Sequence, residues 1–299
     1  WLRYYHKIEL LTSALNVYVD NNEKMSNIKE YIKSQGIEIK GIKFGKSKAQ
    51  YFMDKDENAI YQGISSIKYC NDQIADELYE LSKNHYDNFV DLLSDIISKT
   101  SVDDRQLHIL TTLNFFSEFG KNKYLLSIID MYNLLGKCKT LKKDKIASLN
   151  IREEDVRKCA EKETPKQYSN VDKDKLVKLM ISGLENKSLS IKEQIVYEQE
   201  YLGNIMYKNP KAPKDMYYVL ECKFYKDKTK PYLMLYNMRD GEYLKTKITS
   251  GKSFIESPFI AGNVINVKEF GERNKMKKVG GDWIKTDEKE RIVKKWDVY

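Results

Sequence analysis

Residues 105–123, RQLHILTTLNFFSEFGKNK, constrain the fold of this chain more than any other segment. Apolar residues recur at helical spacing through the first half of the segment, and residues 113–120 interrupt that pattern. A new apolar pattern begins directly after Gly120, and its first residues include Lys121 and Lys123. The sequence therefore predicts two short helices joined by a tight turn, with positive charge at the start of the second helix.

This layout is that of a helix-hairpin-helix, which grips the sugar-phosphate backbone of a nucleic-acid duplex. The turn amides and the N-terminus of the second helix carry partial positive charge, and nearby cations add full charges. We expect the amides of residues 116–120 to face a phosphate. Lys121 and Lys123 would supply charge, and Asn122 would add a hydrogen bond.

The same residues also have a purely structural interpretation. Apolar side chains at this spacing usually pack inward, so we predict that Phe115, Phe116 and Phe119 are core residues. Lys121 and Lys123 would then only cover a solvated surface. The sequence leaves both interpretations of the two lysines open.

Composition sets wide limits on the fold and the partners. The chain has 299 residues, of which 41% are hydrophobic and 12% aromatic, enough apolar material to close a core. A formal net charge of +8 arises from 52 basic and 44 acidic side chains. That excess permits a polyanionic partner, but a solvated lysine surface would give the same balance. No apolar stretch approaches the ~20 residues that span a bilayer, so we expect no membrane partner.

Cysteine and histidine are scattered along the chain. Cys70, Cys138, Cys159 and Cys222 form no Cys-x-x-Cys pair, which argues against a zinc ribbon and against a secreted disulfide framework. We therefore predict a cytoplasmic protein with no metal-binding residues in this stretch. The chain opens at Trp1 inside an expected helix, so we expect it to be a piece of a longer polypeptide.

Turn and breaker residues divide the first two thirds of the chain. Residues 136–164 are charge-dense and weakly periodic, which predicts a linker with one surface helix. Two prolines within residues 208–215 end the helical part. The other elements predicted there are helices at 2–19, 24–35 and 172–207, a small β-hairpin at 51–64, and several short helices from 64 to 135.

After Met216 the chain changes to short runs rich in Tyr, Val, Ile and Phe, separated by turn signals. Five or six strands in so short a segment suit a small closed barrel, and the oligonucleotide-binding (OB) barrel is the leading candidate. The strands are predicted at residues 217–225, 231–238, 243–249, 263–270, 277–284 and 291–298.

Basic and aromatic residues alternate around the first turn of that barrel. Single-stranded DNA binding requires this combination, because bases stack on rings at ~1 to 3 kcal/mol each while cations follow the backbone. A barrel must also bury half of its aromatic residues, so each tyrosine has a core alternative, and we assign Trp283 and Trp296 to packing. The predicted DNA contacts are Lys223, Tyr225, Lys226, Lys228, Lys230 and Tyr232.

Five segments resemble, in the same order, the C-terminal half of bacterial C-family DNA polymerases, the alpha subunit of DNA polymerase III. WLRYYHKIELLTSALN is similar to the end of the fingers domain, and QGISSIKYCNDQIADEL to the first of two hairpins. Residues 105–123 are similar to the second hairpin, where the family has Leu-Glu-x-Leu-Ile-x-Ala-Gly-Ala-Phe-Asp. The remaining two segments are NIKEYIKSQGIEI and EQIVYEQEYLGNIMYKNP, the latter similar to the segment just before the family's barrel.

Departures from the family pattern indicate a divergent member, of a bacterium or a bacteriophage. Tyr69, Cys70 and Asn71 replace a Gly-Val-Gly turn in the first hairpin, and Asn114 and Phe115 replace Gly-Ala in the second. Glycine lets turn amides approach a phosphate closely, so the second hairpin is the better candidate. The DNA contacts implied in the two hairpins are Lys68, Asn114, Gly120, Lys121, Asn122 and Lys123.

The resemblance implies an α+β multidomain protein that binds primer-template DNA and single-stranded DNA, with replisome proteins as further candidate partners. A clamp-binding peptide would precede the barrel, but KQYSNV at residues 166–171 lacks the required hydrophobic-aromatic end, so no sliding clamp is predicted. The implied domains are the end of the fingers (1–50), a tandem helix-hairpin-helix domain (51–135), a charged linker with helices (136–215) and an OB-fold barrel (216–299).

The chain carries no recognisable catalytic residues. The family's palm motif Pro-Asp-x-Asp does not occur, and the acidic clusters stand at turns and helix starts, where capping acids are common. The catalytic aspartates and the Mg²⁺ of the parent polymerase would therefore belong to other residues, and we predict no cofactor here. Two alternatives stay open: a non-enzymatic DNA-binding replication accessory protein, and a replisome scaffold.

Overall fold

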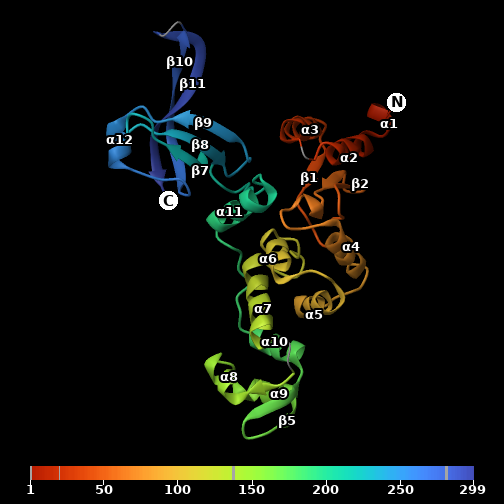
Figure 1. The fold of residues 1–299 in the computed structure, drawn as a ribbon. Coiled ribbons are helices and arrows are strands. Elements are labelled where there is room, and N and C mark those ends of the chain that lie inside the picture. Colours follow the sequence, from red (N-terminus) through yellow and green to blue (C-terminus); the bar gives the residue numbers. More distant parts are fainter. Residues whose placement is uncertain (1, 20, 137–138, 280–281) are drawn as a thin grey trace. The chain divides into compact units, whose positions relative to one another are not determined.

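The structure is a computed structural model that describes residues 2–19, 21–136, 139–279 and 282–299 (Figure 1). The chain forms two compact units, Trp1–Gly203 and Asn204–Tyr299. Helices and two small sheets make up the first unit, and a five-stranded sheet makes up most of the second. This is the mixed α+β composition that the sequence predicts.

The first unit begins with helices beside a small sheet, as predicted. Leu15 and Ile32 from two helices form one buried cluster with Ile60 of the central strand. That strand completes the expected hairpin on one side and pairs in parallel with a further strand on the other. In chain order the elements are α1 (Leu2–Tyr5), α2 (Lys7–Val17), α3 (Asn22–Ser34), β1 (Glu38–Lys40), β2 (Phe52–Asp54) and β3 (Ala59–Tyr61).

Short helices follow, and polar side chains fix where three of them begin. Asn71, Asn88 and Asp103 each accept a hydrogen bond from the backbone N–H three residues ahead, which satisfies a donor that the helix leaves free. Phe116 and Leu92 are fully buried in the core that these helices share. The elements are η1 (Ile64–Ser66), α4 (Asp72–Leu81), α5 (Phe89–Lys99), α6 (Asp104–Thr112) and α7 (Asn122–Leu135).

The segment expected to be a charged linker is folded. Its strands form a three-stranded sheet in the order β4-β6-β5, and Tyr168 and Val156 are completely buried. Helix α11 follows and starts with a capping box made by Ser190 and Glu193. The elements are β4 (Leu141–Lys142), α8 (Lys143–Ser148), α9 (Glu153–Cys159), β5 (Ala160–Glu163), β6 (Gln167–Val171), α10 (Lys173–Ile181) and α11 (Ile191–Leu202).

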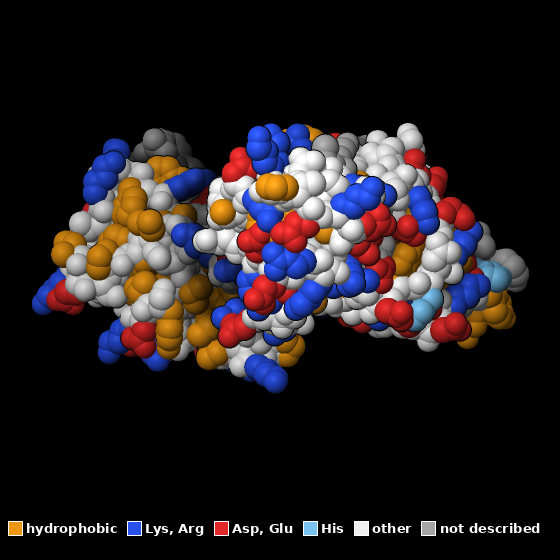
Figure 2. Space-filling view, turned by 90° about the horizontal axis from the view of Figure 1, so that it is seen from below, with side chains coloured by type: hydrophobic (Ala, Val, Ile, Leu, Met, Phe, Trp, Pro, Cys, Tyr) orange, Lys and Arg blue, Asp and Glu red, His pale blue; other side chains and the backbone are white. Residues whose placement is uncertain are grey.

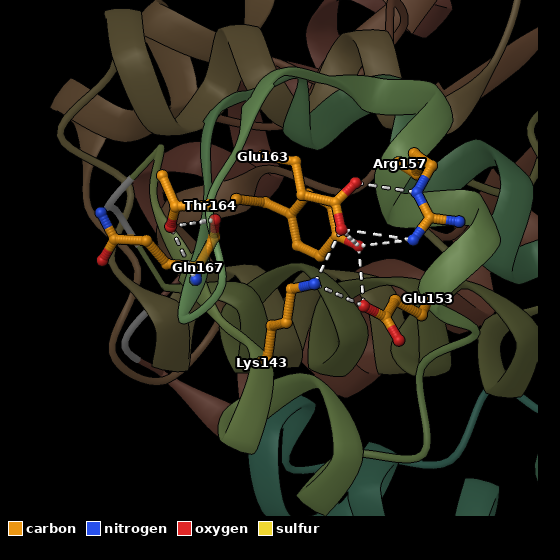
Figure 3. Close-up of polar contacts among 7 residues, drawn as sticks. Lys143, Glu153, Arg157, Glu163, Thr164 and Gln167 are labelled. Atoms are coloured by element: carbon orange, nitrogen blue, oxygen red, sulfur yellow. Dashed lines mark hydrogen bonds and ion pairs between the residues drawn. The ribbon is translucent and has the colours of Figure 1, made fainter.

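Ion pairs explain why this sheet escaped detection in the sequence. Lys143 Nζ lies 2.7 Å from Glu163 Oε1 and 3.1 Å from Glu153 Oε1, and Arg157 Nε lies 2.9 Å from Glu163 Oε2 (Figure 3). The hydroxyl of Tyr168 donates to Glu153 at 2.8 Å. Residues that look like solvated linker charges are therefore partners that join β5 and β6 to α8 and α9.

The ion pairs of Glu163 should make this part of the fold sensitive to acid. Hydrogen bonds from Arg157, and then from Lys143 and Tyr168, lower the pKa of Glu163 from 4.5 to about 2. A carboxyl whose folded pKa is depressed stabilises the fold above its ordinary pKa, and that contribution is lost as the pH falls through the folded value. At pH 7 we expect Glu163→Gln to accelerate hydrogen exchange in β5 and β6, and near pH 2 we expect most of the difference from wild type to be lost.

Glu161→Gln is the matched control for this experiment. Glu161 lies on the same strand and accepts a hydrogen bond from Asn170, which a glutamine can also accept. This variant should exchange like wild type at both pH values. An effect of Glu163→Gln that stays constant from pH 7 to pH 2 would contradict the assigned pKa.

The second unit is an antiparallel sheet in the order β11-β10-β7-β8-β9. The first three expected strands are confirmed, whereas the last three correspond to two long paired strands. The expected strand at 277–284 is divided between β10 and β11, and its residues 280–281 lie outside the described part. Figure 1 shows these two strands extending beyond the other strands of the unit. The elements are β7 (Met216–Lys223), β8 (Tyr232–Asn237), β9 (Tyr243–Lys247), α12 (Gly251–Glu256), β10 (Val264–Val279) and β11 (Asp282–Val298).

The two outer strands of this order meet over a short stretch, where residues 246–248 contact residues 290–293. Ile248, just after β9, forms a parallel bridge with Val293 of β11, and Thr246 Oγ1 donates to the carbonyl of Arg291 at 2.8 Å. The structure therefore gives a five-stranded sheet with one closing bridge, not the fully closed barrel that the sequence predicts. Trp296 is buried and donates to Ser257 O, which confirms its packing role, whereas the side chain of Trp283 lies outside the described part.

Candidate nucleic-acid interface

The first hairpin turn, residues 67–71, joins η1 to α4. Tyr69 occupies the left-handed region at φ +73°, a backbone conformation that favours glycine. Its carbonyl accepts a hydrogen bond from Gln106 Nε2 at 3.0 Å, and the amide of Lys68 donates to Tyr201 O at 3.0 Å. Helices α6 and α11 thus hold a turn that contains no glycine.

Two exposed cations flank this turn. Lys68 was predicted from the sequence, whereas Arg105, the second residue of α6, was not. The guanidinium carbon of Arg105 lies 3.3 Å from the centre of the Tyr69 ring, and Lys68 Nζ lies 5.0 Å from it. A hydrogen bond from Lys68, together with the charges of both cations, lowers the pKa of Tyr69. The contact between Arg105 and Tyr69 could not be predicted from the sequence, because the two residues are 36 positions apart and no local pattern links them.

The second hairpin turn differs from the expectation because the chain covers part of it. The amide of Lys121 donates to Asn186 Oδ1 at 2.8 Å, and the amide of Tyr124 donates to Lys187 O at 3.1 Å. The amides of Lys121 and Tyr124 at the start of α7 are therefore taken up by a segment of the same chain. Of the amides at residues 116–120 that we expected to face a phosphate, those of Ser117 and Phe119 donate to Asn114 O and Phe116 O within the turn. The side chains of Lys121 and Lys123 remain exposed.

Asn122 is a structural residue at this turn, not a surface group as expected. Its side chain is 2% exposed, and Nδ2 donates to Thr112 O at 3.1 Å and to Gln194 Oε1 at 2.7 Å. Its Oδ1 accepts from the amide of Leu189 at 2.8 Å. Asn122 therefore joins α6, α7 and α11, and its hydrogen-bonding groups are used inside the protein.

The remaining residues of the second turn shape it. Phe115 and Phe116 are buried with ring centres 4.8 Å apart, and Phe119 is partly buried, which confirms the core prediction. Asn114 is exposed in the left-handed region at φ +64°. Gly120 has φ +153°, and a Cβ there would lie 2.9 Å from Tyr124 Cδ1, so this position requires glycine.

A cavity of about 480 Å³ lies beside the second turn. Phe44, Phe119 and Tyr124 line its apolar side. Asp87 and Glu118 also line it and bring carboxylates, which repel a phosphate. The lining of this cavity therefore does not favour a phosphate.

In the second unit, the residues predicted to bind single-stranded DNA all lie exposed at or near the turn between β7 and β8. The rings of Tyr225 and Tyr232 are 5.1 Å apart, edge to face, and Lys247 Nζ lies 5.2 Å from the Tyr232 ring. Lys223 pairs with Glu221 and Lys230 with Asp227. Among the described ion pairs none involves Lys226 or Lys228.

Charge is mixed on the face of the molecule that Figure 2 presents. Basic and acidic side chains are intermingled there. None of the described helices is long and apolar enough to cross a bilayer. The same residues contain no group of three or more His, Cys, Asp or Glu side chains placed to hold a metal ion.

Comparison with known proteins identifies the hairpins. Residues 36–126 match a family model described as a helix-hairpin-helix motif. The match covers both turns and under a third of the chain. No curated protein sequence matches the chain. A helix-hairpin-helix motif indicates nucleic-acid binding, and DNA binding in particular.

The position of Asn122 predicts a large effect on stability. Asn122→Ala would leave Gln194 Oε1, Thr112 O and the Leu189 amide without their partner inside the protein. We expect the free energy of unfolding to fall by about 3 kcal/mol, since each buried group left unpaired costs about 1 to 3 kcal/mol. Urea unfolding of the whole chain measures this change. Lys123→Ala, at the exposed neighbouring position, should stay within about 0.5 kcal/mol of wild type; equal losses in both variants would contradict the assignment.

Proposed function

We propose that these residues are the DNA-binding C-terminal portion of a replicative DNA polymerase of the C family, which synthesises DNA on a DNA template. One observation carries the proposal: the segment that matches the helix-hairpin-helix motif contains two turns, each with a pair of exposed cations. These are Lys68 and Arg105 at the first turn, and Lys121 and Lys123 at the second.

Primer-template duplex is the partner that fits the two turns. A duplex presents phosphates at regular intervals, and two phosphate-binding turns in one folded unit can engage it together, which raises the overall affinity. The N-terminus of α4 adds partial positive charge at the first turn. No described hydrogen bond uses the amides of Tyr69, Asn71 or Asp72.

Duplex binding by the second turn is tested by removing its two lysines. Each phosphate contact contributes about −0.9 to the slope of log K against log salt. We expect Lys121→Ala with Lys123→Ala to reduce that slope by about one to two in fluorescence-anisotropy titrations of primer-template DNA. Titrations identical to wild type would reject the second turn as a contact.

We further propose that the second unit is an OB fold that guides single-stranded template. The strand order, the position of α12 between β9 and β10, and the parallel bridge from Ile248 to Val293 support this fold. That bridge brings the two outer strands together, as closure of a five-stranded barrel requires. Tyr225 and Tyr232 would stack on bases, while Lys226 and Lys228 follow the phosphates.

Stacking on these tyrosines can be separated from charge. Tyr225→Leu with Tyr232→Leu should weaken binding of a single-stranded oligonucleotide by about 1 to 3 kcal/mol per stacked base. The matched variant, with phenylalanine at both positions, keeps the rings and should bind like wild type. Equal affinities of the leucine and phenylalanine variants, measured by fluorescence quenching, would exclude base stacking at this site.

Nucleotide transfer itself would reside in other parts of the polymerase. The Mg²⁺ ions that such chemistry requires need converging carboxylates, and the described residues offer no such group. The reading frame that contains this chain separates the alternatives: a palm domain with paired aspartates supports the polymerase, whereas a frame without one supports an accessory DNA-binding protein.

A further inference from the structure

The first hairpin turn contains no glycine and carries a bulky aromatic ring at Tyr69. Tyr69 adopts a left-handed backbone conformation that disfavours residues with a side chain, and its ring is 42% exposed. The neighbouring hydrogen bonds from Lys68 N and Gln106 Nε2 hold the turn in this shape. A glycine here would leave the backbone open to a phosphate, whereas the tyrosine limits close approach.

The guanidinium of Arg105 stacks on the ring of Tyr69. The guanidinium carbon lies 3.3 Å from the ring centre, a stacking distance at which the flat face of the cation rests on the aromatic face. In this arrangement the N–H groups of the guanidinium point outward in its own plane. The stack restricts the long side chain before any ligand arrives, which lowers the entropy lost on binding.

No carboxylate of the described residues neutralises this cation. Arg157, by contrast, pairs with Glu163, and Arg273 pairs with Glu290. Of the acidic residues next to the turn or to Arg105, Asp72 accepts from the Ser65 hydroxyl and Asp103 accepts from the Gln106 amide. Asp104, which precedes Arg105 in the chain, is exposed and forms no described ion pair with it. Lys68 also forms no described ion pair, so two positive charges gather around one exposed ring.

We propose that Arg105, stacked on Tyr69, is the group by which the first hairpin binds a backbone phosphate of DNA. It does so in place of the backbone amides that a glycine turn would present. The proposal rests on the duplex binding proposed above and names its contact at this turn. A guanidinium donates two parallel hydrogen bonds to a phosphate, which lysine cannot reproduce. The tyrosine is therefore a positioning residue, and the arginine is the contact.

Tyr69→Gly tests the proposal because binding by the turn amides and binding by Arg105 predict opposite changes in affinity for duplex DNA. Glycine relieves the left-handed backbone, so the variant should fold at least as well as wild type. If the amides bind the phosphate, opening the turn raises the affinity for duplex DNA. If Arg105 binds it, loss of the ring lowers the affinity. We expect a decrease of about threefold to tenfold, and Tyr69→Phe, which keeps the ring, should bind like wild type.

Substitutions of Arg105 separate the charge from the planar group. Arg105→Gln should weaken duplex binding about tenfold and reduce the salt slope by about 0.9. Arg105→Lys keeps the charge, so the slope should persist while the affinity falls. Lys83→Gln is the matched control, because it removes one exposed positive charge at the other end of α4. All variants are compared in the full chain by anisotropy with one duplex.

The outcomes distinguish this inference from the proposed function. Salt-dependent duplex binding by wild type, with weaker binding by Tyr69→Gly and by both Arg105 variants but not by Tyr69→Phe or Lys83→Gln, supports both. If wild type binds duplex and Tyr69→Gly binds it equally or more tightly, the role of the stacked Arg105 is overturned. The proposed duplex-binding function is unaffected by that result. Equal losses of duplex affinity in Arg105→Gln and Lys83→Gln would mean that Arg105 contributes only as one surface charge among others. That result also overturns the inference. A wild-type chain that does not bind duplex overturns both.

Discussion

Helix α11 and the residues just before it hold both hairpin turns, and the geometry of the interface depends on these contacts. Tyr201 O accepts from the Lys68 amide at the first turn, while Gln194 and Asn186 accept from Asn122 and Lys121 at the second. These bonds join residues that are far apart in the chain and lie partly in the buried core. Because α11 lies outside residues 36–126, the matched segment alone lacks the contacts that position its turns.

Charge serves two purposes in the first unit, and only the structure separates them. In residues 141–171 the cations Lys143 and Arg157 form ion pairs with Glu153 and Glu163, and these ion pairs stabilise a small sheet. At the first hairpin, Arg105 has no such partner among the described residues and rests on an aromatic ring. A net charge of +8 therefore does not indicate where a polyanion would bind. The positions of cations without a described ion-pair partner are a better indication.

Several features of the fold and the site could be predicted from local sequence. Helix starts at Asn71 and Asp103 follow from the capping preference of their side chains, and Phe115 and Phe116 follow from apolar spacing. The first three strands of the second unit follow from alternating apolar residues bounded by turn signals. Each of these depends on interactions within a few residues along the chain.

The sequence by itself determined the two hairpins, their aromatic core and the strand-rich end, since short-range spacing and capping encode them. Tertiary structure alone decided that the charged segment folds, that Asn122 is buried, and that Arg105 stacks on Tyr69. It also decided that the last strands form two long paired strands. These features arise from contacts between distant residues whose pairing no local pattern records, because ion pairs and cation–aromatic stacks need only the right residue types brought together by the fold.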